Sequence, residues 1–266
     1  MEPSEIKTFS FTGNLLNPKT HGYEDYLKSM MHSMAYFTST PHSEYFYLCK
    51  DMPIFYHWSC RELATFKYFF WMSMLVGFPA FRNRPIRFEE YPDEAWESGK
   101  RSLGFYNEMD SFEIWNIESI NATLHQVDYY RETQMFRSDE DVLKVYEAIE
   151  KTLDHVEAQA ILGYKFNMDD PSRKPLGKYH MYFNEIIILD NSMMVIQNNA
   201  RMALVLHSVI NYMMTRDEAF CDHLEQYIRN LMRRSTLISE TSEKERTRFF
   251  RILHDRIARR KEKLKI

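Results

Sequence analysis

The chain has 266 residues, 44% of them hydrophobic and 27% charged, which excludes collagen-like, disulfide-scaffold and wholly disordered proteins. It contains only 7 glycines and 9 prolines, so few residues can supply the left-handed turns that hairpin-rich folds require. This scarcity favours helices. The net charge of −4 favours neither a nucleic acid nor a membrane as a partner of the chain as a whole.

The cysteines and the longest apolar stretch indicate the environment of the protein. Cys49, Cys60 and Cys221 are far apart and form no C-x-x-C pair, which fits a reducing compartment and excludes a cysteine-built zinc-finger module in this chain. Tyr68–Phe78 is the longest apolar stretch, with about eleven residues against the roughly twenty that a bilayer needs. The polar start of the chain does not resemble a signal peptide. We therefore expect a soluble intracellular protein with no membrane partner.

The first elements along the chain are predicted to be helical. We expect residues 1–21 to be an irregular lead-in and residues 22–266 to form a single domain. An amphipathic segment that begins at Gly22 has apolar residues at helical spacing and stops before Pro41. A second, short helix is expected over Ser43–Asp51.

A buried central helix is predicted next. Ser59 and Glu62 form a capping-box pattern, in which a hydroxyl and a carboxylate satisfy free N–H groups of a first helical turn. Leu63–Phe78 is apolar on nearly every face, so this helix should be buried all round and end near Pro79. Only around Ile86–Tyr91 do we expect a small strand pair.

The middle of the chain again favours helices. Phe112–Tyr130, Asp139–Lys151 and Val156–Phe166 are predicted helices, and Asp169–Gly177 is a predicted loop. The final part, residues 178–266, contains neither Pro nor Gly.

One long helix, or two broken near Asp190, is expected over Ile186–Met214. Capping-box patterns that begin at Thr215 and at Ser242 indicate two further helices. The elements together predict one all-α domain of about nine to eleven helices, with at most a small β-hairpin.

Catalytic motifs are not found in the sequence. No glutamate has a histidine three residues later, and there is no G-x-S-x-G, P-loop or G-x-G-x-x-G pattern. His57 and His207 lie among apolar residues, where core histidines are the simpler explanation. We expect no catalytic residue, metal or cofactor, and so no enzyme. The alternative is a metal-dependent oxygenase or lipid-modifying enzyme that assembles distant His and Glu residues.

The stretch Leu48–Phe66 is the most specific pattern in the chain. Cys49 and Lys50, then Pro53 and Phe55, then an acidic residue and an apolar helix resemble the signature of nuclear hormone receptor ligand-binding domains. Later stretches follow in the family's order: Leu153–Leu162, Asn199–Met214, Tyr227–Met232 and, similar to the divergent nematode-type receptors, Ser235–Ile257.

The resemblance implies a three-layer helical sandwich that regulates transcription in the nucleus, or there and in the cytoplasm. It implies an apolar cavity for a small lipophilic ligand, for which the inward apolar positions are Met34, Tyr47, Phe70 and Met74. It also implies a groove for a coregulator peptide helix, with the matching residues Lys50, Phe55, Phe66 and Lys67. Lys50 would cap the docked helix, or only favour the C-terminus of its own helix.

A homodimer or heterodimer is a further expected partner arrangement. A ligand-free scaffold or dimer partner is a further alternative. The seventeen methionines fit either an adaptable pocket or ordinary core filling.

The end of the chain is strongly basic. Residues 246–266 carry nine Lys or Arg against two Asp or Glu, a charge of +7 that leaves −11 on the remainder. This tail is either a nuclear-import or nucleic-acid patch, or the solvated face of a last helix. The apolar side of that helix would be Phe249, Phe250, Leu253 and Ile257.

Overall fold

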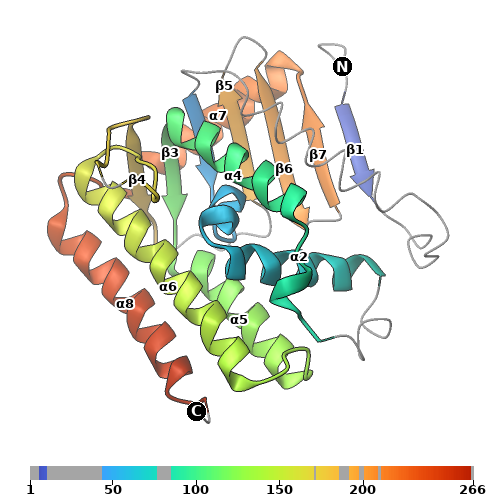
Figure 1. Ribbon diagram of the computed structural model, residues 1–266. Coiled ribbons are helices and arrows are strands. Elements are labelled where there is room, and N and C mark those ends of the chain that lie inside the picture. The colour runs from blue at the N-terminus through green and yellow to red at the C-terminus, as the bar shows by residue number, and fades with distance from the viewer. Residues whose placement is uncertain are drawn as a thin grey trace.

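A mixed β-sheet covered by helices forms the protein (Figure 1). The computed structural model describes residues 6–10, 44–76, 85–170, 172–185, 192–197, 201–208 and 211–264. Within these residues the sheet has eight strands in the order β1-β7-β6-β5-β2-β3-β4-β8. The expected all-α sandwich is therefore wrong, and the fold is α/β. The strands are β1 (Ile6–Ser10), β2 (Glu44–Leu48), β3 (Asp110–Trp115), β4 (Tyr179–Phe183), β5 (Ser192–Gln197), β6 (Met202–Ser208), β7 (Asn211–Thr215) and β8 (Thr236–Leu237).

The sheet has a parallel half and an antiparallel half. β2, β3 and β4 run parallel and are joined by helical crossovers, which need no tight hairpin turn. These crossovers explain how a glycine-poor chain can still form the parallel half of the sheet. β5, β6 and β7 form an antiparallel meander beside β2, with β1 on its outer edge. The helices predicted over Ile186–Met214 are wrong, because the described residues of that range form these three strands.

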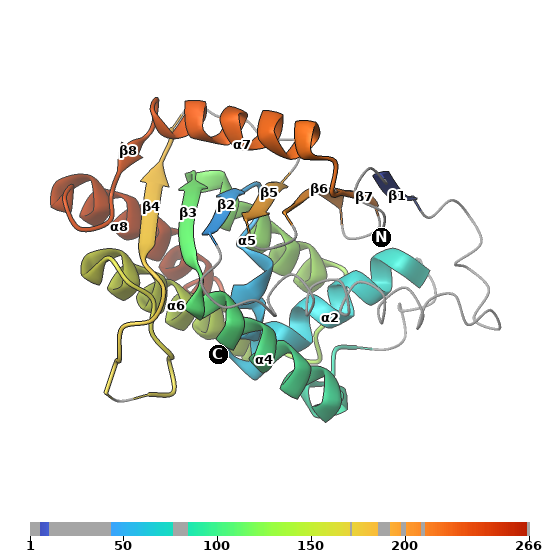
Figure 2. The same cartoon turned by 90° about the horizontal axis from the view of Figure 1, so that it is seen from above.

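Helices cover the two faces of the sheet unequally. Figure 2 shows α7 along one face and the other described α-helices on the opposite side. The described helices are η2 (a 3₁₀ helix, Ile54–Ser59), α2 (Arg61–Val76), η3 (a 3₁₀ turn, Phe88–Glu90), α4 (Asp93–Glu108), α5 (Ile117–Glu132), α6 (Asp139–Leu162), α7 (Glu218–Met232) and α8 (Glu243–Lys261).

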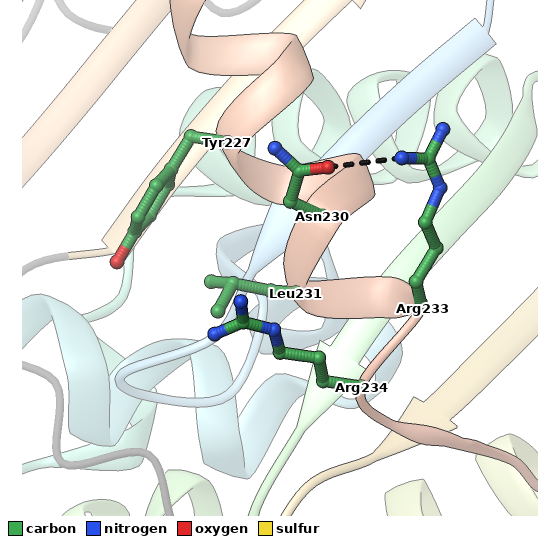
Figure 3. A pocket seen from close by; sticks show the side chains of 5 residues that line it. All are labelled: Tyr227, Asn230, Leu231, Arg233 and Arg234. Atoms are coloured by element: carbon green, nitrogen blue, oxygen red, sulfur yellow. Dashed lines mark hydrogen bonds between the residues drawn. The ribbon is translucent and has the colours of Figure 1, made fainter.

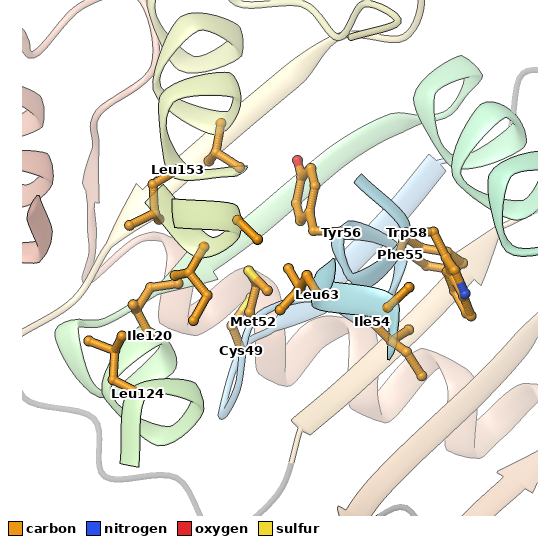
Figure 4. Packing of buried hydrophobic residues seen from close by; sticks show 14 of the residues in the cluster. Cys49, Met52, Ile54, Phe55, Tyr56, Trp58, Leu63, Ile120, Leu124 and Leu153 are labelled. Carbon is orange, nitrogen blue, oxygen red and sulfur yellow. The ribbon is translucent and has the colours of Figure 1, made fainter. Parts of the chain in front are cut away.

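Alternation along β2 divides the core into two parts. Tyr45 and Tyr47 pack into the larger cluster with the helices α2, α4, α5, α6 and α8, whereas Phe46 and Leu48 pack with α7. Figure 4 shows the larger cluster around the bend that leads from β2 into α2. Because both faces of β2 are buried, its sequence lacks the polar–apolar alternation that marks a strand with one wet face.

Several predicted helices need correction. The range Ser43–Asp51 contains β2, so the receptor-like stretch that follows joins a strand, and not a helix, to α2. The range Phe112–Tyr130 is divided between β3 and α5, because the Asn116 side chain accepts a hydrogen bond from Ser119 N and starts a new helix there. Ile86–Tyr91 contains a 3₁₀ turn and no strand pair.

Some other helix and loop predictions are confirmed, and two are corrected. α2 covers the described part of Leu63–Phe78, and the loop at Asp169–Gly177 lies between α6 and β4. α6 is one helix where two were expected, and its Ser138 cap accepts a hydrogen bond from Asp141 N. Ser59 does not cap α2 as predicted, since its hydroxyl forms a 2.6 Å hydrogen bond with Thr152.

Two helix starts were expected in the last part of the chain. α7 starts with Asp217 as its cap rather than Thr215. α8 begins after Ser242 as expected, without the side-chain capping bond. Within the predicted irregular lead-in, Ile6–Ser10 forms β1.

Candidate functional site

The carboxyl ends of the parallel strands share one edge of the sheet. β2 ends at Leu48, β3 at Trp115 and β4 at Phe183. In open α/β sheets this is the edge where ligands usually bind, because the loops that follow the strands are free to carry polar side chains. Two groups of polar side chains lie along it, one after β2 and one where the C-terminal turn of α7 meets the end of β4.

The group after β2, called here the edge cluster, consists of Asp51, Lys67, Thr123 and Gln126. The Lys67 Nζ donates to Asp51 Oδ2 at 3.3 Å, to Thr123 Oγ1 at 3.1 Å and to Gln126 Oε1 at 2.7 Å. Asp51 also accepts hydrogen bonds from Thr123 Oγ1 at 2.5 Å and from Gln126 Nε2 at 3.2 Å. The cluster thus joins the end of β2 to α2 and α5.

Burial and charge act in opposite directions in this cluster. Burial alone would raise the pKa of Asp51, but the Lys67 ammonium, with smaller contributions from His57 and two hydrogen bonds, holds that pKa below its usual range. Burial lowers the pKa of Lys67, and the Asp51 carboxylate offsets part of that shift. Since all three N–H groups of the ammonium have acceptors, Lys67 is held as an ion-pair partner and not as a free nucleophile.

A separate polar cluster, away from the two groups on the sheet edge, lies inside the helical layer that covers one face of the sheet. The buried Glu113 carboxylate accepts hydrogen bonds from the hydroxyl of Tyr106, from Trp115 Nε1 at 2.7 Å and from the Tyr179 hydroxyl at 3.0 Å. Burial raises the pKa of Glu113, although these donors and Lys165 act against that shift. Because its residues are buried, we interpret this Glu113 cluster as a polar network that stabilises the core and not as a substrate site.

Lys165 is buried next to the Glu113 cluster. Its Nζ donates to the backbone carbonyl of Tyr106 and to Ser111 Oγ at 2.7 Å, and it lies 3.8 Å from the centre of the Tyr106 ring. Burial lowers the pKa of Lys165 to about 7, although the carboxylates of Glu113 and Asp110 act in the opposite direction. The two acceptors match the two N–H groups of a neutral amine.

An accessible hollow lies at the C-terminal end of α7 (Figure 3). It has a volume of about 480 Å³. Its lining, called here the α7 hollow, combines an aromatic ring, an amide, an aliphatic side chain and two guanidiniums: Tyr227, Asn230, Leu231, Arg233 and Arg234. The Tyr227 side chain is 43% exposed.

The backbone beneath the hollow is fixed from both ends. α7 starts where Asp217 Oδ1 accepts a hydrogen bond from Phe220 N at 2.8 Å. At the other end Ser235 Oγ donates to Leu231 O at 2.7 Å and accepts from Asn184 Nδ2 at 2.9 Å. Asn184 directly follows β4, so the hollow is tied to the carboxyl edge of the parallel strands.

The hollow is positively charged. Arg233 Nη1 donates to Asn230 Oδ1 at 3.1 Å, which leaves its other N–H donors for a ligand. The Arg234 guanidinium has no hydrogen bond or ion pair within the described part of the chain. No carboxylate lines the hollow, and the nearby Glu225 pairs with Arg201 and with Arg229.

The residues predicted to line a lipophilic pocket lie in different surroundings. Tyr47 is buried in β2, and Phe70 is half-buried in α2. Met74 belongs to α2, and Met34 lies outside the described residues. The lipophilic pocket stays a prediction.

The residues predicted for a partner-helix groove surround the bend after β2. Phe55 and Phe66 are buried, with Phe55 stacked on Tyr106 at 4.7 Å between ring centroids. Lys67 is buried in the edge cluster, and the backbone N–H of Lys50 donates to Ser192 Oγ at 3.2 Å. The groove, too, stays a prediction.

The described part of the basic tail up to Lys261 belongs to the packed helix α8. Phe249, Phe250, Leu253 and Ile257 of α8 are buried, as the apolar spacing predicted. Several of its cations form ion pairs with other helices: Arg256 with Glu118, Arg260 with Asp128 and Lys261 with Glu150. The predicted apolar side of the helix is confirmed, whereas these three cations are partly buried ion-pair partners. The nuclear-import or nucleic-acid role of the tail stays a prediction. Arg251 and Arg259 remain exposed.

Sequence reasoning missed the α7 hollow. The sequence predicts Tyr227–Met232 only as a family helix. The signal that it offers is a tyrosine three residues before an asparagine, followed by the adjacent pair Arg233 and Arg234. A hollow depends on how a helix end meets its neighbours, which spacing alone does not show.

The described residues show neither a membrane-spanning helix nor a metal site. None of the described helices combines the length and the apolar character needed to cross a bilayer. Over the same residues, no three His, Cys, Asp or Glu side chains are grouped as a metal site would require.

Comparisons with known proteins do not assign the chain to a family. No family description, no curated protein and no solved structure matches it. The receptor resemblance, and the transcriptional role that it implies, therefore remain predictions.

Proposed function

We propose that the protein is a nucleotide-binding protein whose ligand, a flat base joined to a phosphate, binds in the α7 hollow without being turned over. The observation that carries this proposal is the lining of one open hollow by an exposed tyrosine ring and two guanidiniums, with no carboxylate among them.

The size of the hollow fits one nucleotide unit. Small-molecule sites commonly measure about 300–1,000 Å³, and the α7 hollow has about 480 Å³. In Figure 3 the Arg234 guanidinium lies beside Leu231, on the side of the helix that carries Tyr227. A ligand that fills this space can touch the ring and the cation together.

Each half of the lining suits one half of a nucleotide. Base–tyrosine stacking contributes roughly 1–3 kcal/mol and tolerates any base, because every base has a π-face. A guanidinium presents paired N–H donors that match two oxygens of a phosphate. The Asn230 amide and Leu231 would contact the edge of the base and the sugar.

Helix electrostatics explain only part of the arrangement. Two arginines at the end of α7 complement the partial negative charge of its last carbonyls, as basic residues often do at a helix C-terminus. That role does not require the exposed tyrosine or the hollow between them. Binding without turnover is proposed because the lining residues contain no pair of a nucleophile and a general base.

Titration calorimetry at 50 mM and 150 mM salt tests the proposal with AMP, ATP, GTP and a single-stranded RNA decamer. We expect saturable binding that weakens with salt. Binding of the decamer that exceeds mononucleotide binding per site would identify a nucleic acid as the source of the base and phosphate. The absence of saturable binding for all four ligands would overturn the proposal.

Variants locate the site. Arg233→Ala combined with Arg234→Ala should lower the affinity at least tenfold, because charge-assisted hydrogen bonds to phosphate contribute about 1.5–3 kcal/mol each. Tyr227→Ala should weaken binding by a similar factor. The matched control, Arg251→Ala with Arg259→Ala, removes the same charge from exposed positions on α8 and should leave the affinity unchanged. Equal losses in both arginine double variants would overturn the assignment to the hollow.

A lipophilic ligand, as the receptor resemblance implies, would behave differently. Its affinity should not depend on Arg233 or Arg234, and salt should not weaken it. A lipid panel measured on the same variants therefore distinguishes the two functions.

A further inference from the structure

The chain that leaves the α7 hollow carries two hydroxyl residues directly after two arginines. The segment reads Arg233-Arg234-Ser235-Thr236-Leu237 and connects α7 to β8. The two hydroxyls differ in their surroundings. The Ser235 hydroxyl bonds Leu231 O and the Asn184 side chain, whereas Thr236 is exposed.

We propose that Thr236 is a phosphorylation site for an arginine-directed serine/threonine kinase, and that its phosphate competes with the ligand for the arginines of the α7 hollow. The second half of the inference rests on the proposed nucleotide-binding function. In the reaction the Thr236 Oγ1 forms a bond to the γ-phosphorus of ATP, the bond from that phosphorus to the β–γ bridging oxygen breaks, and ADP leaves. The hydroxyl proton passes to the catalytic aspartate of the kinase.

Charge provides the recognition. A kinase that binds its substrates through acidic side chains would recognise two adjacent guanidiniums placed two and three residues before the acceptor hydroxyl. Arg234 has no ion pair within the described residues, and Arg233 bonds only the Asn230 amide there. A kinase can therefore bind both guanidiniums without breaking an ion pair of the protein.

The location of Thr236 permits access. β8 has two residues, lies at the end of the sheet and pairs with β4 alone. Edge strands this short open at a small free-energy cost compared with central strands. A kinase could therefore bind the segment in an extended form without unfolding the core of the sheet.

The phosphate would act on the hollow through the same guanidiniums. Phosphothreonine carries about −1.5 to −2 charges at pH 7 and three acceptor oxygens. Because Thr236 follows Arg234 by two residues, its phosphate would pair with the arginines that line the hollow. Ligand phosphate and protein phosphate would then compete for the same donors.

Phosphate transfer is measured on the full chain with an arginine-directed kinase and ATP, followed by intact mass and peptide mass spectrometry. We expect one phosphate per chain, at Thr236. Thr236→Val keeps a β-branched side chain in the strand and should lower incorporation at least tenfold. The matched control, Thr241→Val, changes another exposed threonine that lacks preceding arginines and should change nothing.

Two results would overturn the modification site: a phosphate located at Ser235 or elsewhere, or incorporation that persists in the Thr236→Val variant. Thermal unfolding of this variant, expected to match the unmodified chain, separates a lost acceptor from a lost fold.

The effect on the hollow is a separate measurement. The phosphorylated chain should bind nucleotide at least tenfold more weakly than the unmodified chain in the same titration. An unchanged affinity after full phosphorylation would overturn the regulatory half. If the unmodified chain binds no nucleotide, the proposed function and the regulatory half fail together, whereas the phosphate position still decides the modification site.

Discussion

Lys67 Nζ of α2 lies 3.3 Å from Asp51 Oδ2, and this ion pair joins the bend after β2 to the first α-helix of the crossover. The two side chains are exposed to different extents, with 1% of Lys67 and 29% of Asp51 accessible to solvent. Thr123 and Gln126 of α5 complete the hydrogen bonds of both partners. The edge cluster therefore fixes the positions of three segments relative to one another: the bend after β2, α2 and α5.

Removing one partner of this pair should destabilise the fold more than removing both. Lys67→Met or Asp51→Asn alone should lower the free energy of unfolding by about 2–4 kcal/mol, because each leaves a buried polar or charged group without its partner. The double variant should recover at least about 1 kcal/mol of the summed loss. Urea unfolding of the four chains gives the coupling energy directly.

A control for this cycle is the exposed pair of Arg87 and Glu90, whose side chains are 53% and 52% accessible. Arg87→Ala should change stability by less than about 0.5 kcal/mol. Strictly additive effects of Asp51→Asn and Lys67→Met would show that the edge cluster contributes no coupling.

The helices that carry strong local signals were predictable from the sequence. The apolar run after Leu63 predicted α2, and the Ser138 cap predicted the start of α6. The spacing of Phe249 and Phe250 with later apolar residues predicted the buried side of α8. In each case the local pattern and the tertiary contacts agree.

The strands were missed because their patterns are ambiguous. β2, with both faces buried, and the run from Met193 through Ile196 in β5 are short and continuously apolar, and periodicity cannot distinguish such runs from buried helix. The β-branched Val195, Ile196 and Val205 were the available signal. Asn116 at the start of α5 was also readable as a helix cap, which would have separated β3 from α5.

The polar clusters could not be predicted for a different reason. Asp51 and Lys67 are 16 residues apart, and Thr123 and Gln126 come from another helix, so only the folded chain joins them. The family resemblance predicts a role for Lys50, one residue before Asp51, whereas the ion pair of the edge cluster is formed by Asp51.

The buried amine of Lys165 should make stability depend on pH near neutrality. Its pKa is about 7 in the folded chain and about 10.4 for a free lysine, so the unfolded state binds more protons between these values. Stability should therefore rise with pH from about 7 to about 10. Below pH 7 both states are protonated and the contribution of Lys165 is constant.

Replacing this lysine isolates the effect. Lys165→Met should remove the rise, so that the difference in unfolding free energy between the unmodified chain and the variant changes between pH 6.5 and pH 9. Lys151→Met, at an exposed position of α6, should show the same pH dependence of the unfolding free energy as the unmodified chain. Parallel curves for all three proteins in urea titrations would contradict the assignment.

Two glycines of α4 should respond in opposite ways to the same substitution. A Cβ at Gly99 would overlap the indole ring of Trp58, which donates a 3.3 Å hydrogen bond to the Tyr91 hydroxyl. A Cβ at Gly104 would meet no atom within 4 Å. Gly99→Ala should therefore destabilise the protein by about 1–2 kcal/mol, and Gly104→Ala should stabilise it by about 0.5–1 kcal/mol. Thermal unfolding of both variants checks the signs, and stabilisation by both would contradict the predicted overlap.

Glu113 should tolerate an amide but not an aliphatic side chain. Glu113→Leu leaves the donors of Tyr106, Trp115 and Tyr179 without an acceptor and should cost at least about 3 kcal/mol, since each buried unsatisfied donor costs about 1–3 kcal/mol. Glu113→Gln keeps an acceptor for Trp115 and Tyr179, so it should cost less than about 1.5 kcal/mol.

Because burial raises the pKa of Glu113, the folded state binds more protons than the unfolded state above about pH 4.3. The unmodified chain should therefore lose stability relative to Glu113→Gln as pH rises from about 4.3 through the raised pKa. Urea unfolding at pH 4, 5, 6 and 7 measures this trend, and a constant difference would show that the carboxyl has the same pKa in both states.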